Sequence, residues 1–136
     1  MLDQLLERYR GLSATASFNE WAGVQVVRMA EGECELSMRW RALDMGQYGG
    51  FLHAGLIAAL LDTACGFAAS TKSWSVLTSQ FSVNCLAPAI GDEFRAIGRV
   101  VKAGRKQIFS SGELFAIRDH SSKLVATATA VLVPGD

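Results

Sequence analysis

The stretch QYGGFLHAGLIAALLDTACGF, residues 47–67, decides the fold of this 136-residue chain. A helix is expected from about His53, and residues 54–69 carry only two strongly polar side chains, Asp62 and Thr63. A helix that is apolar all round is buried on all sides, yet this one is too short, and with Asp62 too acidic, to span a membrane. We therefore expect the rest of the chain to wrap it, with the Asp62 carboxylate inside. A buried carboxylate needs a charged or hydrogen-bonding partner, so Asp62 is the first candidate functional residue.

Alternation of apolar and polar residues predicts strands on both sides of this helix. One face of residues 33–40 is apolar and consists of Cys34, Leu36, Met38 and Trp40. The six predicted strands end at glycine, proline or polar turn signals and cover residues 24–29, 33–40, 77–86, 93–103, 106–118 and 123–133. Tight turns join successive strands antiparallel. We expect one α+β domain over residues 1–136, an antiparallel sheet of five to six strands curled around the long central helix, with a partner covering what stays open.

The N-terminal residues predict a short amphipathic helix. Leu5, Leu6 and Tyr9 recur at helical spacing, and Gly11 is expected to end the helix. This charged segment lacks the basic region and apolar run of a secretory signal. The formal net charge of zero does not favour a nucleic-acid surface or a polybasic membrane patch. We expect neither nucleic acid nor membrane as a partner.

Cysteine and histidine usage indicates the compartment and the kind of site. Cys34, Cys65 and Cys85 lie far apart in apolar patterns without a C-x-x-C pair. Their odd number predicts buried free thiols in a reducing compartment, the cytoplasm. With only His53 and His120, a histidine-rich metal site is not expected.

The start of the central helix offers hydrogen-bond donors for an oxyanion. A helix N-terminus has unsatisfied N–H groups and the positive end of the dipole. Gly49 and Gly50 allow a close approach of backbone and ligand, and the Gln47 carboxamide can donate to the same carbonyl oxygen. Donors aimed at developing negative charge contribute about 3–4 kcal/mol each in acyl transfer. Asp62 would then activate water or attack the carbonyl itself, and the residues leave both roles open.

Asp62 and the helix start cannot form one site within a single chain. Nine residues separate His53 from Asp62, which places the two about 13 Å apart on roughly opposite sides of the helix. A two-fold dimer with antiparallel central helices would bring Asp62 of one chain to the helix start of the other. The spacing therefore predicts a homodimer with two shared sites.

In the order of its elements and in the residues Gln47…His53-Ala54-Gly55…Asp62, the chain resembles the hotdog-fold acyl-CoA thioesterases. It is most similar to the PaaI-like branch of the 4-hydroxybenzoyl-CoA thioesterase superfamily. The family pattern is an Asn or Gln, a His-Gly-Gly six residues later, and an acidic residue on the helix. Here Ala54-Gly55 replaces the two glycines, and the similarity extends to Leu86-Ala87-Pro88-Ala89 and Gly104-Arg105.

This resemblance implies a hotdog fold and a catalytic set of Asp62, Gln47, His53, Ala54 and Thr78. The Ala54 amide and Gln47 would bind the thioester carbonyl, and Thr78 would hold the water or the carboxylate. Gly55 would contact the substrate, and His53 would either contact it or orient the preceding loop. The resemblance implies no metal and no cofactor besides the coenzyme A of the substrate, and a tetramer made of two dimers.

Basic side chains gather around one predicted hairpin, at Arg99, Lys102, Arg105 and Lys106. Such an edge can serve only to discourage strand pairing. Alternatively, Arg105 and Lys106 would clamp the phosphates at the nucleotide end of coenzyme A, which is the assignment we prefer.

The expected activity is hydrolysis of an aromatic or medium-chain acyl-CoA. Two alternatives stay open: a hydratase or dehydratase of acyl thioesters on the same fold, and a non-catalytic acyl-CoA-binding module. Asp62 can also be a structural carboxylate, and Thr78 an ordinary strand residue. A serine or cysteine hydrolase is not favoured, because the sequence has no G-x-S-x-G elbow.

Overall fold

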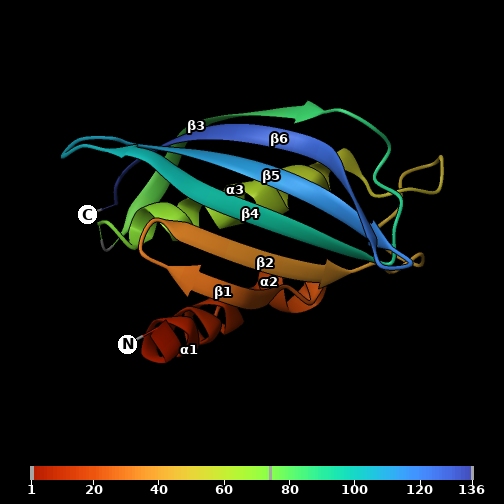
Figure 1. Cartoon of the computed structure of the whole chain (residues 1–136), viewed down its shortest axis with the longest axis horizontal. Helices are drawn as coiled ribbons and strands as arrows, with labels where there is room; N and C mark the ends of the chain where they lie inside the picture. The colour runs from red at the N-terminus through yellow and green to blue at the C-terminus, as the bar shows by residue number, and fades with distance from the viewer. Residues whose placement is uncertain (1, 74, 136) are drawn as a thin grey trace.

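One antiparallel sheet curls around one long helix in the computed structural model, which describes residues 2–73 and 75–135 (Figure 1). The helices are α1 (Leu2–Ala14), α2 (Ser17–Ala22) and α3 (Ala54–Ser70). The strands are β1 (Gln25–Ala30), β2 (Glu33–Arg39), β3 (Val76–Cys85), β4 (Glu93–Ala103), β5 (Ile108–Arg118) and β6 (Ser121–Pro134). Their order across the sheet is β1-β2-β4-β5-β6-β3, so β1 and β3 form its edges. The predicted α+β architecture is confirmed.

The N-terminal region differs from its prediction. α1 continues through Gly11 to Ala14, and the second helix α2, which was not predicted, follows it. The helical run ends instead at Gly23, whose φ of 73° is the left-handed conformation of a helix C-terminus. The prediction that Gly11 ends the first helix is wrong, because a glycine stops a helix only where the chain needs that conformation.

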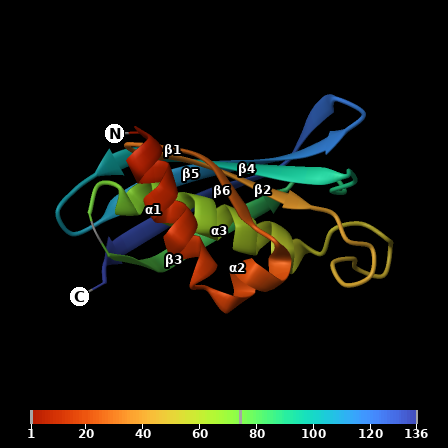
Figure 2. The ribbon, with the colours of Figure 1, turned by 90° about the horizontal axis from the view of Figure 1, so that it is seen from below.

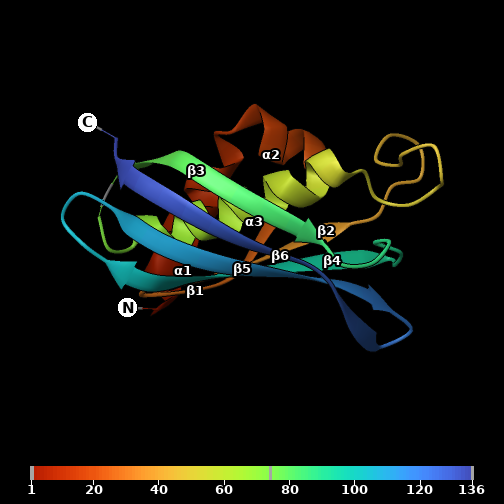
Figure 3. The same cartoon turned by 90° about the horizontal axis from the view of Figure 1, so that it is seen from above.

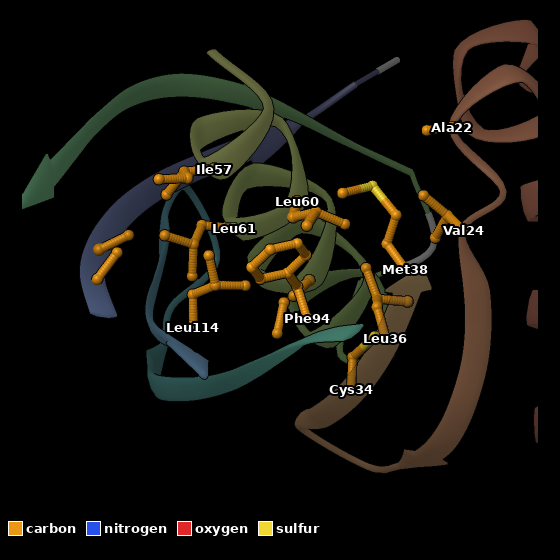
Figure 4. Close-up of a cluster of buried hydrophobic side chains, with 14 of the residues drawn as sticks. Ala22, Val24, Cys34, Leu36, Met38, Ile57, Leu60, Leu61, Phe94 and Leu114 are labelled. Atoms are coloured by element: carbon orange, nitrogen blue, oxygen red, sulfur yellow. The ribbon is translucent and has the colours of Figure 1, made fainter. Parts of the chain in front are cut away.

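The buried face of α3 forms the centre of the core. Ile57, Leu60 and Leu61 point from the helix toward the sheet (Figure 4). The strand side chains of the same cluster include Leu36, Phe94 and Leu114. Each such side chain contributes about 1.5–3 kcal/mol when it is fully buried, and together they hold the sheet against the helix.

The sheet approaches α3 most closely at two paired glycines, Gly98 of β4 and Gly112 of β5. A Cβ atom at Gly98 would collide with the backbone carbonyl of Ala64. At Gly112 it would lie 3.1 Å from both Cys65 Sγ and a Leu61 methyl carbon. Glycine at these two positions lets the helix backbone lie directly against the strands.

α3 is not buried all round, which corrects the prediction from its composition. Its N-terminal residues Ala54 and Gly55 are exposed, and the helix side that carries Asp62 is only half-buried. The sheet covers one side of α3, and α1 and α2 lie across part of the other (Figure 2). The neighbouring edge strand β3 leaves Leu77 60% and Phe81 40% exposed. Apolar surface therefore continues from the helix to the sheet edge.

The thiols also differ in part from the prediction. Cys34 and Cys65 are buried, whereas Cys85 is exposed at the end of β3. The prediction that all three are buried is wrong for Cys85, because its strand lies at the edge of the sheet. No helix in residues 2–73 and 75–135 is long and apolar enough to cross a bilayer.

Replacing Gly98 with alanine will destabilise the protein. The added methyl group must push the Ala64 carbonyl of α3 away from the sheet, and overpacking of this kind costs about 1–3 kcal/mol. Gly11→Ala is the matched control: no atom lies within 4 Å of its added Cβ, and alanine is favoured over glycine in a helix by about 1 kcal/mol. Urea unfolding should show opposite signs for the two variants. Equal stability of Gly98→Ala and wild type would contradict the close approach.

Candidate active site

The first turn of α3 leaves one amide unpaired. His53 is the N-cap, and its Nδ1 accepts a hydrogen bond of 2.8 Å from the Gly55 N–H. The His53 carbonyl accepts from the N–H groups of Leu56 (2.9 Å) and Ile57 (3.2 Å). Among the described residues, the Ala54 N–H finds no acceptor. A ligand oxygen at this helix start would therefore meet one free donor and the positive end of the helix dipole.

Gln47 begins a tight turn next to this helix start. Its carbonyl accepts from the Gly50 N–H at 2.9 Å, and its side-chain Oε1 accepts from the Gly49 N–H. A Cβ atom at Gly49 would lie 2.7 Å from that oxygen, so glycine gives the side chain room. Because the carboxamide oxygen is bound, the NH₂ group is the part left to donate. Gln47 and Ala54 line the same cleft of about 320 Å³.

Asp62 lies in a different cleft, where β3 supplies its partner. The Thr78 hydroxyl donates a 2.7 Å hydrogen bond to Asp62 Oδ1, which fixes one carboxylate oxygen and so orients the other. Both residues line a cleft of about 860 Å³ between α3 and the N-terminal helices. Asp62 is half-buried in the single chain, so the chain's own elements cover this carboxylate only in part.

The predicted site residues thus fall into two groups within one chain. Gln47 and Ala54 share one cleft, and Asp62 and Thr78 share another. Eight residues of α3 separate Ala54 from Asp62, a rise of about 12 Å. The Gly55 amide is occupied by His53, which leaves Ala54 as the donor of this turn.

The hairpin that joins β4 to β5 extends at one end of the sheet (Figure 3). Its basic residues Lys102, Arg105 and Lys106 are exposed. Strand register places Thr78 of β3 in line with Ile108 at the start of β5. The hairpin therefore begins at the same end of the sheet as Thr78, and Ile108 lies about 10 Å from Thr78 across two strand spacings. Arg99, on β4, forms ion pairs with two carboxylates, Glu113 at 3.4 Å and Glu33 at 3.9 Å.

The Cys65 thiol, three residues after Asp62, is not a nucleophile of this site. Burial, together with the nearby Asp62 charge, raises the pKa of Cys65 to about 12. A thiol with such a pKa is protonated and unreactive near neutral pH. In residues 2–73 and 75–135, no three His, Cys, Asp or Glu side chains are placed to hold a metal ion.

Sequence reasoning missed the residues that close the Asp62 cleft on its other side. Leu12, Thr15 and Ala16, at the junction of α1 and α2, form this wall. The only signal was the amphipathic pattern of α1. α2 has just six residues, and its N-cap Ala16 makes no side-chain hydrogen bond, so no capping signal marked its start.

A six-stranded antiparallel sheet curled around one long helix is the hotdog fold. The sequence profile of the thioesterase superfamily matches residues 49–123, more than half of the chain. The chain therefore belongs to the thioesterase superfamily.

Solved structures agree with this assignment. A thioesterase family protein from Silicibacter pomeroyi is 34% identical, with a TM-score of 0.88, over 98% of this chain and 97% of that one. The Escherichia coli PaaI protein shares the fold at 18% identity (TM-score 0.88, 100% and 97% covered). A Haemophilus influenzae thioesterase shares it at 21% identity (TM-score 0.83, 94% and 88% covered). No curated protein sequence matches the chain.

Removing the N-cap of α3 will lower stability. His53→Ala deletes the acceptor for the Gly55 N–H and should cost about 1 kcal/mol in urea unfolding. His53→Asn keeps a side-chain acceptor at the N-cap and should retain most of the stability. Comparing thioester hydrolysis in the two variants separates capping from substrate contact. An asparagine variant as unstable as the alanine variant would argue against the capping role.

Proposed function

We propose that this thioesterase hydrolyses an aromatic or medium-chain acyl-CoA to the carboxylic acid and free coenzyme A. The observation that carries the proposal is the hydrogen bond from Thr78 to Asp62, which orients a carboxylate at the edge of a large cleft. Membership of the thioesterase superfamily supplies the reaction class. No cofactor is needed, because water and the substrate are the only reactants.

The residues support a short reaction sequence. The thioester carbonyl oxygen accepts from the Ala54 N–H and the Gln47 NH₂ group, which stabilise the oxyanion that forms. Asp62 takes a proton from a water molecule as that water attacks the carbonyl carbon. The C–S bond then breaks, and the thiolate leaves and is protonated. In the alternative route, Asp62 attacks directly, and water opens the resulting anhydride. Arg105 and Lys106 would bind the nucleotide phosphates of coenzyme A.

A second copy of the chain would complete this site. The ten-residue edge strand β3 pairs only with β6 among the described residues, and the adjacent side of α3 is open. Antiparallel pairing of two β3 strands about a two-fold axis would cover this surface. It would also bring Asp62 of one chain toward Gln47 and Ala54 of the other. The proposed unit is a homodimer with two shared sites, assembled further into a tetramer, and its free thiols suit the cytoplasm.

The geometry does not favour the hydratase alternative. An acyl-thioester hydratase of this fold would pair a histidine with an acid, whereas His53 Nδ1 is bound to the Gly55 amide. A purely binding module would not need an oriented carboxylate beside its ligand cleft.

Asp62→Asn should lower thiol release from a panel of acyl-CoAs by about 10³-fold, the typical contribution of a general base. Thr78→Val should also lower kcat, because Asp62 loses its hydrogen-bond donor, while Thr78→Ser should keep most of it. Asp119→Asn is the matched control, since Asp119 lies in the exposed β5–β6 turn with a φ of 51°, which asparagine tolerates. Full activity of Asp62→Asn would make the carboxylate structural. Hydration of enoyl-CoA without any thiol release would replace the thioesterase proposal with a hydratase.

Mixing inactive subunits tests the shared site. Gln47→Ala chains lack an oxyanion donor, and Asp62→Ala chains lack the carboxylate. A heterodimer of the two carries one intact site if each site takes residues from both chains, so activity should return to at most half the wild-type level per dimer. Native mass spectrometry of tagged chains will confirm that subunits exchange. Exchange without recovered activity would rule out a site spanning two chains.

A further inference from the structure

The middle of α1 is fixed against α3 by the side chain of Tyr9. The Tyr9 and Phe67 rings meet edge to face, with centroids 5.2 Å apart, and the Tyr9 and Ser70 hydroxyls are hydrogen-bonded at 2.6 Å. Arg10 Nε donates to the Val26 carbonyl of β1 at 3.2 Å. Beyond this anchor, the end of α1 and the start of α2 lie across α3 (Figure 2). Leu12, Thr15 and Ala16 of this region line the Asp62 cleft.

The cleft beside Asp62 has apolar and polar lining residues, and Arg8 of α1 contributes a guanidinium group to it. Leu12 of α1 faces a floor that includes Phe67 and Leu132. Gly66 lies four residues after Asp62, on the same side of α3, and adds no side chain to the cleft. A Cβ atom at Gly66 would lie 3.6 Å from Leu132, so the missing side chain keeps a passage open from the carboxylate into the cleft.

Three of the polar side chains along the cleft are hydrogen-bonded to the protein. Thr15 donates to the Leu12 carbonyl at 2.7 Å, and Thr63 donates to the Ala59 carbonyl at 2.8 Å. The Asn19 carboxamide donates to Ser13 at 3.1 Å. A neutral polar group placed beside these three side chains, away from Arg8, would give up hydrogen bonds to water without gaining full replacements, at a cost of about 1–3 kcal/mol.

We propose that this cleft binds the acyl group, and that the α1–α2 junction, Leu12 with Thr15 and Ala16, sets which acyl groups are accepted. The proposal rests on the proposed function, since Asp62 marks where the thioester carbon lies. The accepted class is apolar, either an alkyl chain of medium length or an unsubstituted aryl group. Acyl groups that carry a hydroxyl group are disfavoured. A cleft of about 860 Å³ lies in the usual range for small-molecule sites.

Calorimetric binding of thioether analogues tests the wall without requiring turnover. The probes are S-ethyl-CoA and S-octyl-CoA, which cannot be hydrolysed as thioesters. Wild type should bind the octyl analogue at least tenfold more tightly than the ethyl analogue. Leu12→Trp, at a side chain that is 51% exposed, should weaken octyl binding at least tenfold and leave ethyl binding within twofold. Ala14→Trp places the same side chain on the same helix about 200° away, outside the residues that line the cleft, and should bind both probes like wild type.

Two results would overturn the assignment: equal octyl affinities in Leu12→Trp and Ala14→Trp, or equal losses for ethyl and octyl in Leu12→Trp. A second readout is kcat/KM for acetyl-CoA and octanoyl-CoA, where Leu12→Trp should lower kcat/KM only for octanoyl-CoA.

Failure of the proposed function would give a different set of results from failure of the cleft assignment. If wild type bound the probes in the expected order but hydrolysed no acyl-CoA, the cleft assignment would stand and the thioesterase would not. If Asp62→Asn abolished hydrolysis while Leu12→Trp left the chain-length preference unchanged, the thioesterase proposal would stand and the cleft assignment would not.

Discussion

The close approach of α3 to the sheet at Gly98 and Gly112 is the constraint on which the rest of the structure depends. It requires the side of the helix formed by Leu61, Ala64 and Cys65 to face the strands, and this fixes the rotation of the helix about its axis. Asp62 is turned about 100° from Leu61 and therefore lies beside β3, where the Thr78 hydroxyl reaches it. The glycines take no part in the chemistry, yet they determine where the carboxylate points.

The same constraint leaves half of the helix for other surfaces to cover. α1 and α2 cover part of it and enclose the cleft beside Asp62, while the side next to the β3 edge stays open. The free amide of Ala54 and the carboxamide of Gln47 lie at one end of the helix, and the carboxylate lies about 12 Å farther along. In the proposed dimer, the surface that is unfavourable to expose is also the surface that brings these groups together, so folding stability and activity depend on one contact.

Periodicity was sufficient to predict the six strands and the central helix, because each has a strong local pattern bounded by turn residues. Asp62 was identifiable because it interrupts an otherwise apolar helix. The features that the sequence did not predict depend on contacts between segments that are far apart in the chain. Nothing local distinguishes edge strand β3 from an inner strand, so the exposure of Cys85 was missed. The cleft wall depends on the packing of Tyr9 against Phe67, 58 positions apart in the sequence, and the short helix α2 has no capping signal. The pairing of Thr78 with Asp62 was suggested only by resemblance, since no spacing rule joins a strand residue to a helix residue 16 positions earlier.

The unpaired edge of β3 also bears on how a newly synthesised chain survives. Ten residues of uncovered strand, with Leu77 and Phe81 exposed, form a template that any extended segment can join. If only a second copy covers this edge, the stability of the fold rises with protein concentration, and a chain that is alone is also the chain most prone to aggregate. Rapid pairing after synthesis would then protect solubility as much as it serves catalysis.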